Sequence, residues 1–179
     1  MHRSPLLRYL TDYQQQWPEE TILVQRFINF VEAHENCFER SLLQGHVTAS
    51  AWVVNQAGTH VLLTHHRKLN KWLQLGGHAD GNPDVVASAL REVQEESGLD
   101  KFEIDDARLF DIDIHEIPAR KAEPAHFHYD ARFVVTATGS EVYTVSEESH
   151  DLGWIKINNL WELTEEESML RMARKWLAA

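Results

Sequence analysis

The sequence predicts an α/β fold in which a mixed β-sheet packs between helices. Three observations lead to this fold class. The 179 residues are 43% hydrophobic and 25% charged, a composition typical of one ordinary globular domain. Segments with helical periodicity open and close the chain, whereas segments that alternate with period two fill its middle. One capped helix interrupts those strands, as expected when helices cover a central sheet.

Residues 1–44 are predicted to form a helical extension packed on a domain of residues 45–179. Residues 6–16 carry apolar side chains at helical spacing, and Pro18 ends that segment. Residues 19–34 are the second predicted helix. Its apolar stripe consists of Ile22, Leu23, Phe27, Phe30 and Val31.

The remaining elements are strands around one central helix. That helix is expected to have Asn82 as its N-cap and Pro83 in its first turn, and to end at Gly98. Alternating or β-branched runs predict the strands, the first two of which form a hairpin. The predicted strands are residues 47–54, 61–64, 72–75, 107–115, 126–136 and 152–155, and a helix over 165–177 closes the chain.

Charge and composition exclude several classes of protein. Lys and Arg number 17 and Asp and Glu 28, so the net charge of −11 argues against a nucleic-acid partner. Apolar runs are far shorter than the ~20 residues that span a bilayer, which argues against a membrane protein. Cys37 is the single cysteine, which excludes an internal disulfide. Without a signal-peptide pattern, the expected compartment is the cytoplasm.

Three carboxylates on the central helix are the first candidate site. Glu92, Glu95 and Glu96 stand at i, i+3 and i+4, so they lie within about one turn and repel one another. Mg²⁺ would compensate this repulsion, since it takes carboxylate oxygens and keeps positions open for phosphate. The turn at Gly76 and Gly77 lets backbone carbonyls approach an ion closely. The alternative is a solvated acidic helix end.

This segment resembles the signature of the Nudix hydrolases. The signature is Gly, five residues, Glu, seven residues, then Arg-Glu-apolar-X-Glu-Glu-X-Gly-apolar. Read from Gly77, eight of its nine defined positions match, and the departure is Pro83 at the first glutamate. The matching positions further along are Arg91, Glu92, Val93, Glu95, Glu96, Gly98 and Leu99. Together with the strand order, the resemblance implies a Nudix-type α/β/α sandwich over residues 45–179.

The resemblance implies Mg²⁺- or Mn²⁺-dependent hydrolysis of the pyrophosphate bond in a nucleoside diphosphate linked to another group X. An ADP-ribose-like sugar nucleotide is the first guess for the substrate. By position, Glu92, Glu95 and Glu96 become metal ligands and catalytic residues. The Gly76 carbonyl is a further ligand, and Arg91 orients the acids. Whether Asp84 replaces the missing glutamate stays open. The resemblance is also compatible with a homodimer.

Other residues are candidates for substrate contacts. His126, His128 and Asp130 share one face of a strand because side chains alternate, and they either contact metal or phosphate or line a polar sheet face. His78 follows the glycine pair. The basic residues Arg67 and Lys68 either hold phosphates or belong to a solvated loop. By resemblance, Glu147 or Glu148 is the extra catalytic glutamate that many Nudix enzymes carry in a late loop.

Two rival functions follow from the same residues. Isopentenyl diphosphate isomerase resembles this fold and has a glycine–histidine pair like Gly77 and His78, but it needs a cysteine where Gly76 stands. A Nudix domain can also serve as a sensor that binds a nucleotide sugar without hydrolysing it. Such domains often lose their acids, whereas this chain has all three glutamates.

Overall fold

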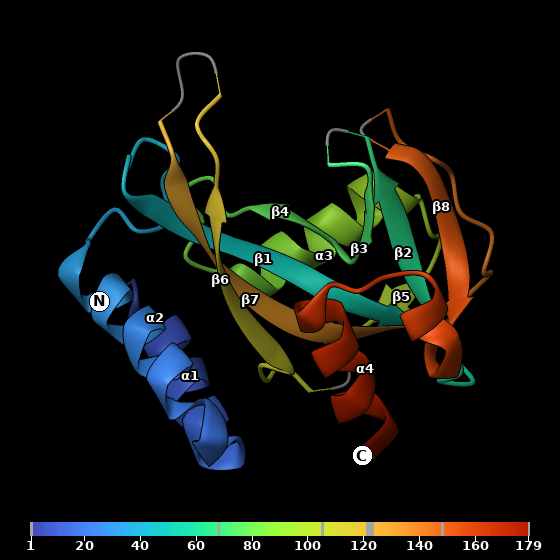
Figure 1. The fold of residues 1–179 in the computed structure, drawn as a ribbon, viewed down its shortest axis with the longest axis horizontal. Coiled ribbons are helices and arrows are strands. Elements are labelled where there is room, and N and C mark those ends of the chain that lie inside the picture. The colour runs from blue at the N-terminus through green and yellow to red at the C-terminus, as the bar shows by residue number, and fades with distance from the viewer. Residues whose placement is uncertain (1, 68, 105, 121–123, 148, 179) are drawn as a thin grey trace.

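The computed structural model describes residues 2–67, 69–104, 106–120, 124–147 and 149–178. Four α-helices and eight strands make up the described fold (Figure 1). The helices are α1 (Ser4–Gln16), α2 (Thr21–Ala33), α3 (Val85–Ser97) and α4 (Glu167–Ala178), with short 3-10 helices η1 (Pro18–Glu20) and η2 (Ile157–Glu162). The strands are β1 (Gly45–Val54), β2 (His60–His66), β3 (Lys71–Leu73), β4 (Leu75–His78), β5 (Phe102–Glu103), β6 (Asp111–Ile117), β7 (His126–Ala137) and β8 (Ser149–Lys156).

The strands form one mixed sheet with β1 at its centre. β1 pairs in parallel with β7 over ten positions, from Gly45 opposite Phe127 to Val54 opposite Thr136. It also pairs antiparallel with β2 and β4. β2 carries β3 and β8, while β7 carries β5 and β6. Every residue of β1 is buried, as expected for a strand covered on both faces.

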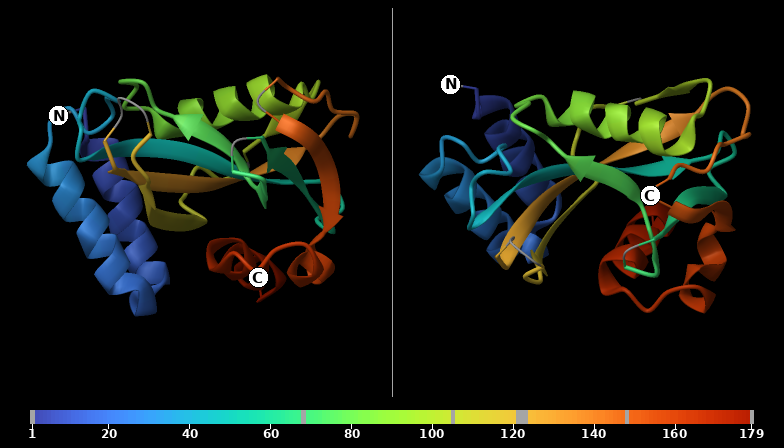
Figure 2. Two further views of the ribbon diagram at one scale, coloured as in Figure 1. Left: turned by 45° about the horizontal axis from the view of Figure 1, so that its top comes forward. Right: turned by 90° about the horizontal axis from the view of Figure 1, so that it is seen from above.

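Helices cover both faces of this sheet, which confirms the predicted α/β/α sandwich (Figure 2). Along β1, Ala51 and Val53 belong to a hydrophobic cluster with Val93 of α3, whereas Trp52 belongs to a cluster with Met172 of α4. Side chains of α1, α2 and α3 share a further cluster with β1 and β7. In it, Phe30 of α2 stacks on Tyr129 of β7 with ring centroids 3.7 Å apart. The helical extension is therefore packed into the same core as the sheet.

Several boundaries differ from the sequence prediction. The segment 72–75 is divided between two strands, β3 and β4. The central helix begins at Val85 rather than near Pro83, because the side chain of Asp84 accepts a hydrogen bond from the N–H of Ala87 and caps it. The end at Gly98 is confirmed, with φ at 61°. Ile22, predicted to join the apolar stripe of α2, is 87% exposed.

A buried ionic network joins both terminal regions to the sheet. The carboxylate of Asp111 in β6 accepts from Arg171 Nε at 2.9 Å and from Lys175 Nζ at 2.7 Å, both in α4. Arg132 of β7 donates to the same carboxylate at 3.2 Å. The hydroxyl of Tyr13 in α1 lies 3.5 Å away. Burial alone would raise the pKa of Asp111, but the hydrogen bond from Arg171 and the surrounding cations lower it below its ordinary value.

No helix in the described parts of the chain combines the length and the apolar character needed to cross a membrane.

Removing the charge of Asp111 should destabilise the fold strongly. Asp111→Asn leaves three cations without their shared, buried counter-ion, and breaking such a network costs about 3–5 kcal/mol. The free energy of unfolding in urea measures this loss. Glu167→Gln is the matched control, since it removes an exposed ion pair with Arg174 and should cost less than about 0.5 kcal/mol. If both substitutions lowered the free energy of unfolding equally, Asp111 would not be the counter-ion on which the network depends.

Candidate active site

Gly76 and Gly77 bring the backbone of β4 close to α3, although a side chain at Gly76 would point to the opposite face of the sheet from one at Gly77. The N–H of Gly76 donates to Glu96 Oε2 at 2.8 Å. A Cβ at Gly77 would lie 2.6 Å from the carboxylate of Glu92, closer than real contacts allow. The strand therefore brings its backbone directly onto two acids of the helix, whereas a Cβ at Gly76 would instead meet the backbone of Ser50 in β1.

The three helix acids differ in exposure. Glu96 is buried, and the side chain of Glu92 is 15% exposed, whereas that of Glu95 is 62% exposed. A solvated acidic helix end, the alternative interpretation of these acids, does not describe Glu96. The glycine strand explains the difference, because it leaves room for a carboxylate between helix and sheet. Two acids face β4 and the third faces solvent.

Arg91 connects the strand to the acids. Its Nη2 donates to the carbonyl oxygen of His78 and to Glu92 Oε1, both at 2.7 Å. Its Nε lies 3.9 Å from Glu95 Oε2. The hydrogen bond to Glu92 raises the pKa of Arg91, so the guanidinium stays charged. Asp84, the neighbour of Pro83, uses its carboxylate to cap the helix.

The loop before β8 is attached to the C-terminal end of α3. The N–H of Thr144 donates to the carbonyl oxygen of Ser97 at 2.7 Å. On the other side, Trp154 Nε1 donates to the carbonyl oxygen of Glu141 at 2.9 Å. Glu147 is exposed on this loop, and Glu148 lies outside the described residues. The contact places Thr144, three residues before Glu147, beside the C-terminal end of α3.

Comparison with known proteins agrees with this geometry. A family model described as the NUDIX domain matches residues 44–176, which is most of the chain. The chain belongs to the Nudix family. Its reaction class is that of a pyrophosphohydrolase. Among curated proteins, none matches the chain.

Solved Nudix structures resemble the fold. A Nudix-family hydrolase from Clostridium perfringens is 25% identical, with a TM-score of 0.54 and coverage of 74% of this chain and 97% of that one. The E. coli dihydroneopterin triphosphate pyrophosphohydrolase is 19% identical, with a TM-score of 0.60 and coverage of 74% and 96%. A C. elegans Ap4A hydrolase is 18% identical, with a TM-score of 0.54 and the same coverages. At these identities the last two show the shared fold alone.

The opposite face of the sheet carries a second polar group of side chains in this Nudix protein. The parallel register places Thr48 and Ser50 of β1 beside Asp130 and Arg132 of β7. Asp130 accepts hydrogen bonds from Thr48 at 2.8 Å, Ser50 at 2.7 Å and Arg132 at 2.8 Å. Asp130, predicted to contact substrate, is 3% exposed and is occupied by these neighbours. Asp130 is thus a buried carboxylate whose hydrogen bonds connect β7 to β1.

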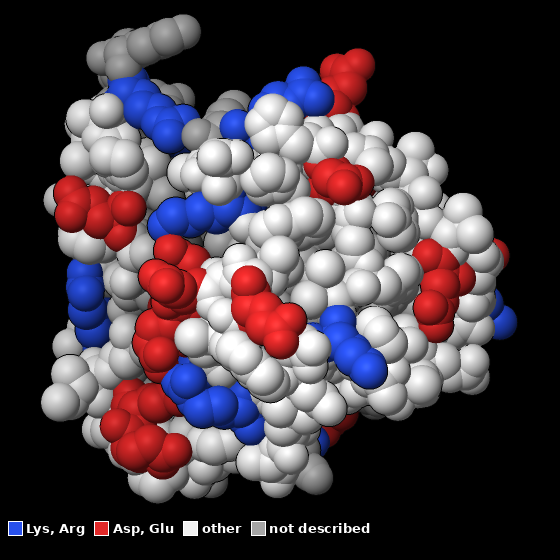
Figure 3. Space-filling model, turned by 45° about the vertical axis from the view of Figure 1, so that its right-hand side comes forward, with Lys and Arg blue, Asp and Glu red and all other residues white. Residues whose placement is uncertain are grey.

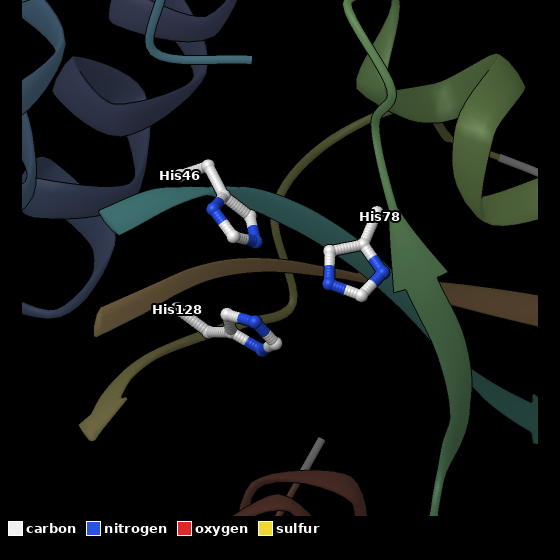
Figure 4. A group of neighbouring side chains, drawn as sticks. All are labelled: His46, His78 and His128. Carbon is white, nitrogen blue, oxygen red and sulfur yellow. The ribbon is translucent and has the colours of Figure 1, made fainter. Parts of the chain in front are cut away.

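Further along the same strands, three histidines come together (Figure 4). His46 of β1, His78 of β4 and His128 of β7 have ring centroids 4.8–5.0 Å apart. His126 lies at their edge, with its ring centroid 5.1 Å from that of His46. The sequence indicated three of these residues as candidates but missed His46. Its period-two relation to Thr48 and Ser50 was visible, but its partner strand was not.

The pKa of each ring in this histidine cluster is lowered. Burial is the main cause, and neighbouring positive or titrating groups add to it, Arg40 among them at His46 and His78. The pKa falls to about 4 at His46 and His78 and to about 2 at His128. All three imidazoles are therefore neutral at physiological pH.

The basic stretch before β3 is partly occupied by contacts within the protein. Arg67 is exposed and donates to the carbonyl oxygen of Ser149 at 3.1 Å. Lys71 pairs with Glu166 at 2.6 Å, and Lys68 lies outside the described residues. On the side of the molecule drawn in Figure 3, acidic and basic side chains are interspersed. The net charge of −11 thus forms no single acidic field on that side.

The two glycines of β4 should respond differently to alanine. In Gly76→Ala the new Cβ would meet the backbone Cα of Ser50 at 2.6 Å, so we expect a loss of about 3 kcal/mol or more. In Gly77→Ala it meets the end of the flexible Glu92 side chain, which can move, so the loss should be smaller than about 1.5 kcal/mol. Urea unfolding of both variants measures the difference, and a reversed order would contradict this packing.

The histidine cluster should also make stability depend on pH. Unfolded histidines bind protons near pH 6.5, whereas the folded rings resist protonation down to about pH 4. The unfolded state then binds more protons, so the free energy of unfolding should fall as pH drops from about 6.5 toward 4. With a chelator present, His128→Asn should reduce the slope by about one proton. Identical slopes for variant and parent would show that burial of these rings is not the cause.

Proposed function

We propose that this chain hydrolyses the pyrophosphate bond of a nucleoside diphosphate linked to a group X, at the interface of β4 and α3. The observation that carries the proposal is the placement of Glu92 and Glu96 against β4, where the N–H of Gly76 donates to Glu96 and the missing side chain of Gly77 leaves room for the carboxylate of Glu92. The exposed side of Glu95 gives the same site access to water.

The donor set suits Mg²⁺ or Mn²⁺. Glu92, Glu95 and Glu96 offer carboxylate oxygens, the ligands that hard cations prefer, and the Gly76 carbonyl is the proposed fourth donor. The space beside Gly77, which a Cβ would fill, is where the Glu92 carboxylate lies. When bound, the ion would polarise the phosphates and lower the pKa of a water molecule.

The protein's own residues orient the metal ligands and accept a proton. Arg91 holds the Glu92 carboxylate and the β4 carbonyl in one arrangement, which fixes the ligand geometry before substrate binds. Glu95 and Glu147 are the exposed carboxylates near the helix end, and one of them accepts the proton of the attacking water at its Oε atoms. A bound metal would supply the positive charge that the leaving phosphate needs, while Arg91 orients the acids that would hold that metal.

The substrate class comes from the fold and from the solved relatives. One solved relative is named as acting on Ap4A and another on dihydroneopterin triphosphate, which are both phosphoric anhydrides. We propose an ADP-ribose-like sugar nucleotide as the first compound to test. Arg67 is the proposed substrate contact. The contacts predicted for His78, His126 and His128 are not part of this proposal, because those rings lie on the sheet face opposite α3. Cytoplasmic location and a homodimer stay predictions.

Glu96→Gln should abolish turnover while the protein stays folded. The glutamine keeps an oxygen that accepts from the N–H of Gly76, but it loses the charge that binds the cation. Because even outer partners of metal ligands contribute 10–100-fold, kcat/KM should fall by about 100-fold or more. Product formation across a panel of nucleoside diphosphate derivatives, with Mg²⁺ or Mn²⁺ present or chelated, measures this.

The matched control is Glu103→Gln, the same change at an exposed position of β5, which should leave kcat/KM unchanged. Full activity of Glu96→Gln would overturn the assignment of this acid. Binding of a panel compound by folded, metal-loaded parent without any product would favour the sensor function instead.

A further inference from the structure

Three imidazole rings converge from neighbouring strands on the sheet face opposite α3 (Figure 4). One ring nitrogen each of His46, His78 and His128 lies within 4.8 Å of the others. Within the described residues, no other group of three or more His, Cys, Asp or Glu side chains converges as closely. The backbone of β4 separates this cluster from the acids, since Gly77 faces Glu92 and the next side chain, His78, faces the other way.

Several ring nitrogens of this cluster are buried without a hydrogen-bond partner. His46 is 3% exposed, and both of its nitrogens are among them in the described part of the chain. A contact with the backbone of Leu42 raises the pKa of His46, but it is outweighed by burial, which lowers that pKa. Nε2 of His128 is also buried without a partner. A buried polar atom in this condition costs free energy that a ligand would recover.

The spacing of the rings matches tetrahedral coordination. A zinc ion holds imidazole nitrogens at 2.0–2.1 Å, which places the centroids of two ligating rings about 5 Å apart. The three observed separations are 5.0, 4.8 and 4.9 Å. The ring nitrogens lie within 4.8 Å of one another, whereas two nitrogens on a tetrahedral zinc ion are ~3.4 Å apart, so the rings must turn toward one another to share an ion. Because the rings are neutral, their lone pairs are available to it.

The surroundings suit a nitrogen site. His126, whose ring is 5.2 Å from that of His128, has its Nδ1 held by the carbonyl oxygen of Pro124 at 2.9 Å. Such a backbone partner fixes the tautomer of a ring next to a metal. The ring of His115, 5.4 Å from that of His128, has its Nδ1 3.0 Å from a carboxylate oxygen of Asp113. His78 and His128 are half-buried, which gives an ion a path from solvent.

We propose that His46, His78 and His128 form a binding site for one divalent transition-metal ion of the Zn²⁺ type, separate from the acids of α3. Imidazole donors favour zinc and its neighbours over magnesium, which prefers oxygen. Three protein ligands leave one coordination position open, for water, for His126 or for an anionic group of a small molecule. The site does not depend on the proposed pyrophosphohydrolase function.

Zinc titration of the metal-stripped full-length protein tests this site. Calorimetry in excess Mg²⁺, which fills oxygen sites, should show one Zn²⁺ per chain. Co²⁺ in place of zinc should give the visible absorption of a tetrahedral nitrogen site. His46→Gln and His78→Gln should each weaken zinc binding by about 100-fold or more. The double variant Glu92→Gln and Glu96→Gln should bind zinc like the parent.

His60→Gln is the matched control, because His60 lies on the β1–β2 hairpin outside the cluster and should not affect binding. If the buried variant at His46 does not fold, the half-buried His78→Gln decides. Folded parent that binds no zinc at micromolar concentration overturns the proposal. So does zinc binding that the glutamate variant abolishes and the histidine variants leave intact. Hydrolysis is not the readout, so a failure of the proposed function would be seen separately.

Discussion

The parallel register of β1 with β7 is the constraint on which the polar interior depends. These strands are distant in sequence, and their pairing places His46 beside His128, and Ser50 beside Arg132. A shift by one residue would turn every side chain of β1 to the opposite face. The polar residues would then enter the apolar layer beneath α3, and the small apolar residues would face the ionic network. The buried hydrogen bonds of Asp130 therefore select this register.

The short strand β4 sets the boundary between two kinds of ligand. On the side of α3, Gly77 leaves space that the Glu92 carboxylate fills and the N–H of Gly76 donates to Glu96, and on the other side His78 joins a group of imidazoles. Oxygen donors and nitrogen donors select different cations, so the two faces of one strand can serve different ions. Arg91 binds the carbonyl oxygen of His78. A movement of β4 that is caused at one face would therefore also shift the ligand groups at the other face.

The parts that the sequence predicted are those determined by local pattern. The acids of α3 and the glycines before them stand within one short segment, and the fold class follows from periodicity along the chain. Asp111 and His46 were missed because their importance arises from partners far along the chain, which periodicity does not identify. The burial of Glu96 was missed for a related reason, since it depends on how closely β4 approaches the helix. The sequence predicted Asn82 as the N-cap of α3, whereas Asp84, two residues later, caps the helix. Both side chains accept a hydrogen bond from a backbone N–H in this segment, so the sequence alone does not distinguish them.

The network around Asp111 also makes the fold cooperative. Its members come from α1, β6, β7 and α4, so one carboxylate connects elements that are far apart along the chain. If α4 detached, the buried carboxylate would lose Arg171 and Lys175, two of its three cations. A buried charge without enough compensation is costly, so the sheet and α4 should unfold together rather than one after the other.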